Sequence, residues 1–245
     1  MLKFRILGAL ACAMLSGTAI AQDMPSVLPN DYVLKDILNQ QRVDSAIGPR
    51  PGSRSRPGPP PQPAQPASGK VDTTYRASPQ VSARVVEQYS RSLSARLGSV
   101  QGPKAADALR RGDPLNRWSQ LVGADGLRRG DVADAVAGWW VLSWVIANGA
   151  DSNRAQALGA REQARAMLAA SPSLAGLSDE RRQEMAEVMM LDFVVQQAAY
   201  TSALQRRDQA EARRLGDQAV ARFRQQMGVD LRQVRLTDKG FAKAG

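Results

Sequence analysis

The feature that most constrains the fold is the stretch Asp131–Gly149, DVADAVAGWWVLSWVIANG. It holds three of the four tryptophans in the chain, and no charged residue follows Asp134 until Asp151. At about 100° per residue, its apolar side chains cover most of the circumference of a helix. It contains Gly138 and Ser143 and is shorter than the roughly 20 apolar residues that cross a bilayer. The stretch therefore predicts the buried central helix of a helical domain rather than a membrane span.

Both ends of this helix carry recognisable signals. Asp131 is placed to cap the first turn, and Asp134 adds a favourable negative charge near the positive helix end. Asn148-Gly149 follows the last apolar residue, and glycine readily takes the left-handed conformation that stops a helix. The predicted helix therefore begins just after Asp131 and ends at Gly149.

Residues 1–21 have the pattern of a secretory signal. Lys3 and Arg5 give the positive start, Ile6–Leu15 gives the apolar middle, and Ala19-Ile20-Ala21 gives a small-x-small cleavage site before Gln22. An N-terminal membrane anchor is the alternative, but the apolar run is too short for it. We therefore expect a periplasmic or secreted protein, cleaved after Ala21, with no membrane span in the mature chain.

The chemistry open to the mature chain is restricted. The only cysteine, Cys12, lies inside the signal, and a lipidated Cys12 would require a longer apolar run before it. The sequence also has no histidine. After cleavage, disulfides, thiolate nucleophiles, Cys- or His-ligated metals and histidine acid–base catalysis are all excluded. No cofactor is predicted, and any catalysis would depend on Asp, Glu, Lys, Tyr or Ser.

Two segments separate the signal from the helical domain. Residues 22–47 form a short N-terminal segment, in which Tyr32–Gln41 has its apolar residues on one side of a potential helix. Residues 48–77 form a linker, with eight prolines between Gly48 and Lys70 and arginines but no acids in that range. Such a composition buries too little apolar surface to offset ordering, which predicts disorder with extended stretches. The linker is interpreted as an inert spacer, or as a tether across a wall layer.

From residue 78 to residue 245 the pattern is all-α. We expect a single compact domain of about six or seven helices around the tryptophan-rich helix. The first helix begins at Ser78-Pro79 and ends at Gly98, and short helices follow from Pro103 to Gly112 and from Pro114 to Val122. The next helix is capped by Asp151 or Ser152 and runs to about Ala170.

A long helix capped by Ser178 carries the apolar run MMLDFVVQQAAY, which is expected to pack beside the central helix. Asp208 with Glu211 starts the last helix, and Gly228 stops it. The tail Val229–Phe241 is expected to dock as a short extended or turn segment, and no strand pattern of useful length is seen.

The charge balance is basic, with a formal net charge of +10. For an exported protein this favours anionic cell-envelope components as partners over nucleic acid, with an envelope protein as the other candidate. Arginine-rich composition alone is the simpler explanation. On the last helix, the arginines fall opposite the apolar stripe and predict a basic exterior: Arg206, Arg207, Arg213, Arg214, Arg222 and Arg224.

A few carboxylates are candidates for a catalytic or metal-binding role. Asp192 lies inside an apolar run, where it would be either a general acid of raised pKa or, as we favour, the partner of an arginine on a neighbouring helix. Glu184 and Glu187 lie one turn apart, a geometry that suits a metal or an acid–base pair, although neighbouring arginines explain them equally well. We assign no catalytic, cofactor-binding or metal residue from the sequence.

Two other pairs near the central helix have simpler explanations than ligand binding. Asp131 and Asp134 would suit a cation, but capping accounts for both. Arg128-Arg129 would suit an anion, but the acidic residue that follows argues against it. No phosphate-binding glycine loop or nucleophile elbow is present.

The pattern GLRRGDVADAVAGWWVLSWVIANG, with the closing GVDLRQVRLTDKGF, resembles a family of secreted bacterial proteins of unknown function. Its members have a signal peptide, a variable low-complexity segment and a helical domain with "DVADA", a Trp-rich helix, "ANG" and a terminal "D-x-GF". The resemblance covers about Ser78–Phe241. It implies this layout but no activity, because the family brings no catalytic residues.

Two functions remain for this chain. The first, which we favour, is a non-enzymatic binding or interaction module of the cell envelope. The second is a carboxylate-dependent cell-wall hydrolase, which would need two convergent carboxylates in a cleft. The sequence does not predict the oligomeric state.

Overall fold

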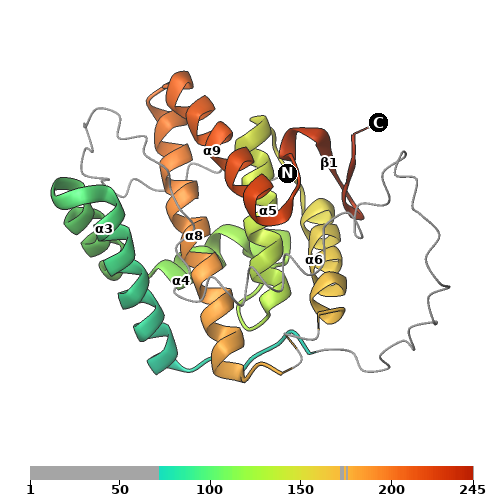
Figure 1. Cartoon of the computed structure of the whole chain (residues 1–245), viewed down its shortest axis with the longest axis horizontal. Coiled ribbons are helices and arrows are strands. Elements are labelled where there is room, and N and C mark those ends of the chain that lie inside the picture. Colours follow the sequence, from blue (N-terminus) through green and yellow to red (C-terminus); the bar gives the residue numbers. More distant parts are fainter. Residues whose placement is uncertain (1–71, 172–173, 175, 245) are drawn as a thin grey trace, which may run out of the picture.

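The computed structural model describes residues 72–171, 174 and 176–244. The expected signal at 1–21, the segment 22–47 and the linker up to residue 71 lie outside the described residues. Within them the chain forms a compact, mostly helical domain with six α-helices and a short C-terminal hairpin (Figure 1). The predicted helical fold is confirmed.

Helix α5 (Val132–Asn148) is the centre of the domain. Its packing partners are α6, α8 and α9, which surround it in Figure 1. Asp131 caps it, with the carboxylate accepting a hydrogen bond from the Ala133 backbone N–H, and Gly149 ends it in the left-handed conformation. Both predicted ends are confirmed. Fifteen of its residues are buried, so the helix forms the core of the fold as its composition predicted.

Three helices pack around α5, and their first residues are fixed by local caps. Ser178 caps α8 (Asp179–Gln205) and Asp208 caps α9 (Gln209–Met227), as predicted. Helix α6 (Arg154–Ala169) is capped by Asn153, which forms a capping box with Gln156, so the expected cap at Asp151 or Ser152 is wrong. Asn153 is preferred because its side chain accepts from the Gln156 backbone N–H, while its own backbone N–H donates to the Gln156 side-chain oxygen.

Helix α3 (Pro79–Arg111) is bent. Only Gly98, at φ 75° and ψ 177°, leaves helical geometry. The helix resumes directly after Gly98, so the expected start of a new helix at Pro103 is wrong. The two halves then fold against one another, and a Cβ at Gly102 would lie 2.0 Å from the Ser94 carbonyl oxygen. The close approach requires glycine at this position. Helix α4 (Pro114–Val122) follows as predicted, and Gly123–Asp125 forms a 3-10 turn.

The C-terminal tail docks on the domain in extended form, as expected, and its two short strands pair with each other, which the sequence did not predict. After a 3-10 turn at Leu231–Gln233, strands β1 (Val234–Thr237) and β2 (Gly240–Lys243) form an antiparallel hairpin. The strands have four residues each, too few for an alternating pattern to stand out in the sequence. The hairpin packs on α6, where a Cβ at Gly159 would lie 2.4 Å from the Asp238 carbonyl oxygen.

Side chains of neighbouring helices hold both outer edges of this hairpin. The Trp144 indole N–H donates to the Val234 carbonyl, and the amide of Gln156 donates to that of Leu236. On β2, the Gln163 amide both donates to the Phe241 carbonyl and accepts from the Phe241 N–H. These contacts satisfy backbone groups that an unpaired edge would leave open.

Residues 72–78, here called the strap, join the start of α3 to the rest of the domain. Tyr75 N–H donates to the Gly130 carbonyl, and Val132 N–H donates to the Thr73 carbonyl, each at 2.9 Å. The Gln183 amide on α8 holds both backbone groups of Ser78. Residues 72–77 fall in the predicted linker, yet Thr73 and Tyr75 are buried in the domain.

Candidate functional site

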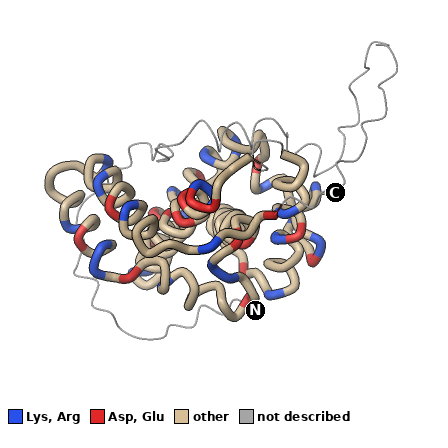
Figure 2. Tube along the Cα trace, turned by 90° about the horizontal axis from the view of Figure 1, so that it is seen from below, with Lys and Arg blue, Asp and Glu red and all other residues tan. Residues whose placement is uncertain are grey.

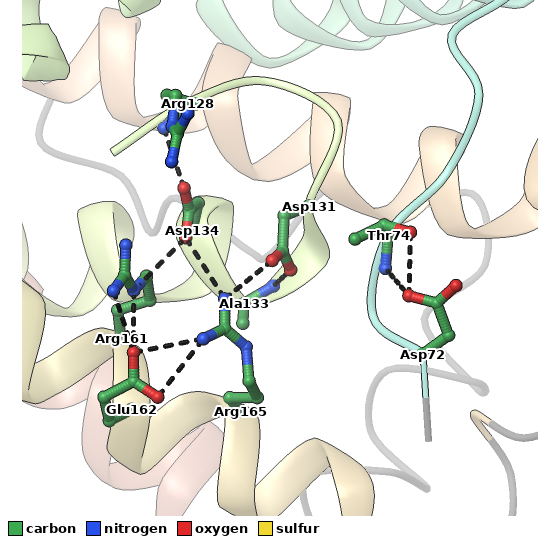
Figure 3. A network of polar contacts seen from close by, with 9 residues as sticks. All are labelled: Asp72, Thr74, Arg128, Asp131, Ala133, Asp134, Arg161, Glu162 and Arg165. Carbon is green, nitrogen blue, oxygen red and sulfur yellow. Dashed lines mark hydrogen bonds and ion pairs between the residues drawn. The ribbon is translucent and has the colours of Figure 1, made fainter. Parts of the chain in front are cut away.

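The acidic pair at the start of α5 is neutralised by arginines of α6 (Figure 3). Asp131 uses one carboxylate oxygen for the cap and accepts from Arg165 Nη2 at 2.8 Å with the other. Asp134 is buried and accepts from the Arg128 backbone N–H at 2.8 Å. Its second oxygen lies 3.8 Å from Arg161 Nε and 4.0 Å from Arg165 Nη2. The pair therefore faces cations that the protein supplies itself.

Burial sets the electrostatics of Asp134. Its removal from water raises the pKa of the carboxyl above the ordinary value, against the lowering effect of the Arg128 N–H. Arg129, the other basic residue of the loop, turns to α8 and forms an ion pair with Glu187 at 3.0 Å. The side chain of Arg129 is therefore already engaged by a carboxylate of the protein.

Glu187 and Glu184 have different surroundings although they lie one turn apart. Glu187 is fully buried, and its Oε1 accepts from Ser82 Oγ at 2.7 Å, Arg129 Nη2 at 3.0 Å and Gln183 Nε2 at 3.1 Å. Glu184 lies nearer the surface and pairs with Arg84 at 2.6 Å and Arg181 at 2.8 Å. The two carboxylates do not converge, so they form neither an acid–base pair nor a metal site.

Asp192 lies half-buried on α8 between α3 and α5. Its carboxylate accepts from Trp139 Nε1 at 2.9 Å, from the Tyr89 hydroxyl at 3.0 Å and from the Gln196 amide at 2.5 Å. Within the described part of the chain no arginine forms an ion pair with it, so the favoured ion pair is wrong. Arg222 reaches it only through Gln196. Three neutral donors hold this carboxylate.

This arrangement also affects Tyr89. Burial, with the Asp192 carboxylate beside it, keeps the pKa of the Tyr89 hydroxyl well above its usual range. The hydroxyl therefore remains a hydrogen-bond donor at neutral pH. We interpret the Trp139–Asp192–Tyr89 contacts as a hydrogen-bond network that joins α3, α5 and α8.

An open groove of about 420 Å³ lies between the two halves of α3 and the start of α4. Its acidic residues are already engaged: Glu87 pairs with Arg91 and Arg110, and Asp113 caps α4. None of the carboxylates considered from the sequence borders it. Its lining residues are Ser82, Ala83, Val86, Glu87, Arg110, Arg111, Asp113, Pro114 and Leu115.

The described residues contain no cluster of three or more Asp, Glu, His or Cys side chains that could hold a metal ion. They also contain no helix that combines the length and apolarity needed to cross a membrane.

Comparison with known proteins places the chain in a family. The model of a family of unknown function, DUF6683, matches residues 6–243. The chain belongs to DUF6683. The match confirms the resemblance at the level of a family of unknown function, and it begins well ahead of the expected Ser78. A search of curated proteins and a search of solved structures each returned no match.

The residues of the family pattern have structural roles in this DUF6683 domain. Trp140 packs edge-on against Phe241, with ring centroids 6.1 Å apart, and Gly240 stands at φ 97° beside Gln163. Asn148 of "ANG" donates to the Leu231 carbonyl at 3.2 Å and so ties α5 to the tail. The pattern therefore marks the contacts that hold the core together rather than a reaction site.

The predicted basic exterior of α9 is smaller than expected. Arg214 pairs with Glu211, Arg224 pairs with Asp230, and half-buried Arg222 donates to a glutamine. Acidic and basic residues are interspersed along the trace in Figure 2. Within the described residues, the arginines of this set that are exposed and have no ion pair are those around the α8–α9 turn: Arg206, Arg207 and Arg213.

Proposed function

We propose that this DUF6683 protein is a non-enzymatic binding module of the bacterial cell envelope that associates with anionic envelope material through the α8–α9 turn. The observation that carries the proposal is the contrast between two sets of charges. The carboxylates that would serve catalysis are held by internal partners, whereas Arg206, Arg207 and Arg213 are exposed and form no ion pair within the described residues.

The turn has a net positive charge because its four arginines, at positions 206, 207, 213 and 214, outnumber its two acids. The Asp208 carboxylate accepts from the Glu211 backbone N–H at 3.0 Å, and the Glu211 side chain pairs with Arg214. Each exposed arginine contributes little alone, and salt screens it over a Debye length of about 8 Å at physiological ionic strength. The proposed binding is therefore weak, multivalent and sensitive to salt.

Export is the second part of the proposal, and the pattern of residues 1–21 supports it. The test is N-terminal mass spectrometry of the chain recovered from the periplasm or medium. A mature chain that begins at Gln22 is expected. An uncleaved chain, or one lipidated at Cys12, would refute this assignment.

Binding is tested by co-sedimentation with anionic vesicles and with purified cell wall, at low and at high salt. The triple variant Arg206/Arg207/Arg213→Gln is expected to lose most of the binding seen at low salt. The matched control is Arg111/Arg117/Arg235→Gln, which removes the same charge from exposed positions elsewhere and should bind like the wild type. Equal binding by both triple variants would refute the proposed surface.

The same samples test the hydrolase alternative. A binding module releases no wall fragments, and Asp192→Asn should leave wall association unchanged. Release of wall fragments by the wild type that disappears in Asp192→Asn would overturn the non-enzymatic proposal.

A further inference from the structure

The strap is bound to the loop before α5 through its main chain. Tyr75 N–H donates to the Gly130 carbonyl, and the Thr73 carbonyl accepts from Val132 N–H. The strap therefore pairs with this loop as one short antiparallel bridge. Neither bond involves a side chain of the strap, so neither depends on which residues the strap contains.

Side chains of the first turns of α8 also bind the main chain of the strap. Arg182 donates to the Asp72 carbonyl at 2.8 Å. The Gln183 amide accepts from Ser78 N–H at 2.8 Å and donates to the Ser78 carbonyl at 2.9 Å. Such contacts recognise an extended backbone, and they place few demands on the sequence of the segment that is bound.

Side-chain selection is limited to two positions of the strap. Thr73 and Tyr75 are buried, whereas Asp72, Thr74 and Arg76 are exposed. This alternation is that of a strand, in which every second side chain faces the domain. Main-chain hydrogen bonds combined with pockets for alternate side chains are the way in which proteins bind an added peptide strand.

The strap can leave without unfolding the core. It buries two side chains in the domain, whereas α5 alone buries fifteen of its residues. A short segment with so few buried apolar groups opens at a lower free energy than the whole domain. Replacement of the strap by another segment is therefore compatible with an intact helical fold.

We propose that the surface under the strap is a peptide-binding groove, in which an extended segment of a partner protein replaces the strap. The partner segment carries a small β-branched residue and, two positions later, an aromatic residue. The strap competes with it from within the same chain. The groove lies at the end of α8 opposite the α8–α9 turn, so this inference goes beyond the proposed function and does not depend on it.

The test uses the full chain and a fluorescently labelled synthetic peptide of residues 72–78 with blocked ends. Tyr75→Pro in the chain removes the buried ring and the N–H that bonds to Gly130, so the strap no longer fills the groove. Two altered peptides carry Tyr75→Ala or, as the matched control at an exposed position, Arg76→Gln. Fluorescence anisotropy measures binding, and circular dichroism checks that the variant chain folds.

The Tyr75→Pro chain should bind the original peptide at least about tenfold more tightly than the wild-type chain does, because the wild-type strap competes at a high effective concentration. The same chain should bind the Tyr75→Ala peptide roughly tenfold to a hundredfold more weakly, since that peptide buries no ring. The Arg76→Gln peptide should bind like the original.

A folded Tyr75→Pro chain that binds the peptide no more tightly than the wild type would refute the groove. If that chain does not fold, the wild-type chain decides. An excess of the original peptide should speed hydrogen exchange at the Tyr75 amide of the chain, and unchanged exchange would overturn the proposal. A wild-type dimer that the peptide dissociates would also overturn it, because the groove would then serve exchange of straps between two copies.

Discussion

Replacement of Trp139 separates packing from hydrogen bonding in the core. The side chain is 4% exposed, and its ring stacks on Phe223 with centroids 5.5 Å apart and planes 17° apart. Trp139→Ala removes this packing and leaves a cavity, so it should lower the free energy of unfolding by roughly 3–5 kcal/mol. Because domains are stable by only about 5–15 kcal/mol, this loss would be a large part of the total free energy of unfolding.

Trp139→Phe isolates the second contribution. It keeps an aromatic ring against Phe223 but removes the N–H that donates to Asp192 at 2.9 Å. A hydrogen bond to a charged group contributes about 1.5–3 kcal/mol. Since Asp192 is half-buried and keeps its other two donors, we expect a loss at the lower end, about 1–2 kcal/mol.

The assay is urea unfolding followed by far-ultraviolet circular dichroism, which reports on the helices rather than on the substituted tryptophan. A double-mutant cycle with Asp192→Asn measures the coupling between the two side chains. A wild-type midpoint for Trp139→Ala would show that the ring is not part of the core. Equal losses for the Ala and Phe variants would refute the separation into packing and hydrogen bonding.

Three further predictions concern buried polar groups. Burial raises the pKa of Asp134, so the protonated form stabilises the fold at acid pH and this contribution is lost as pH rises above about 4. The free energy of unfolding of Asp134→Asn, relative to that of the wild type, should therefore be higher at about pH 7 than at about pH 4. Urea unfolding at both pH values measures this difference. Gln163→Ala should cost about 1–3 kcal/mol and speed hydrogen exchange at the Phe241 amide; unchanged protection there would refute the edge contact. Burial raises the pKa of Tyr75, to about 12, and also raises the pKa values of Tyr89 and Tyr200, so the absorbance of tyrosinate should rise at higher pH in the folded chain than in the unfolded chain; coincident titration curves would refute this burial.

The sequence predicted features that depend on neighbours within one turn. Asp131, Ser178 and Asp208 cap their helices because the N–H groups that they bind lie two or three residues ahead. The apolar circumference of α5 likewise required burial whatever the partners were. Such features follow from local spacing alone, so most helices began and ended where expected.

The partners of buried polar groups could not be predicted in the same way. The donors to Asp192 include groups from α3 and α5, at positions 103 and 53 residues away. No local pattern distinguishes an arginine partner from a tyrosine and a tryptophan. The hairpin was missed for a related reason, because glutamine and tryptophan side chains of α5 and α6 satisfy its edges. Its stability therefore depends on tertiary contacts rather than on strand composition.

The strap has a mechanical consequence. A pull on the chain N-terminal to Asp72 reaches the domain first at the Asp72 carbonyl, which accepts from Arg182, and then at the hydrogen bonds between Thr73 and Val132 and between Tyr75 and Gly130. These bonds lie one behind the other along the strap, so the load breaks them in succession and not together. The strap would yield at a lower force than the helices behind it, lengthening the chain while the core stays folded.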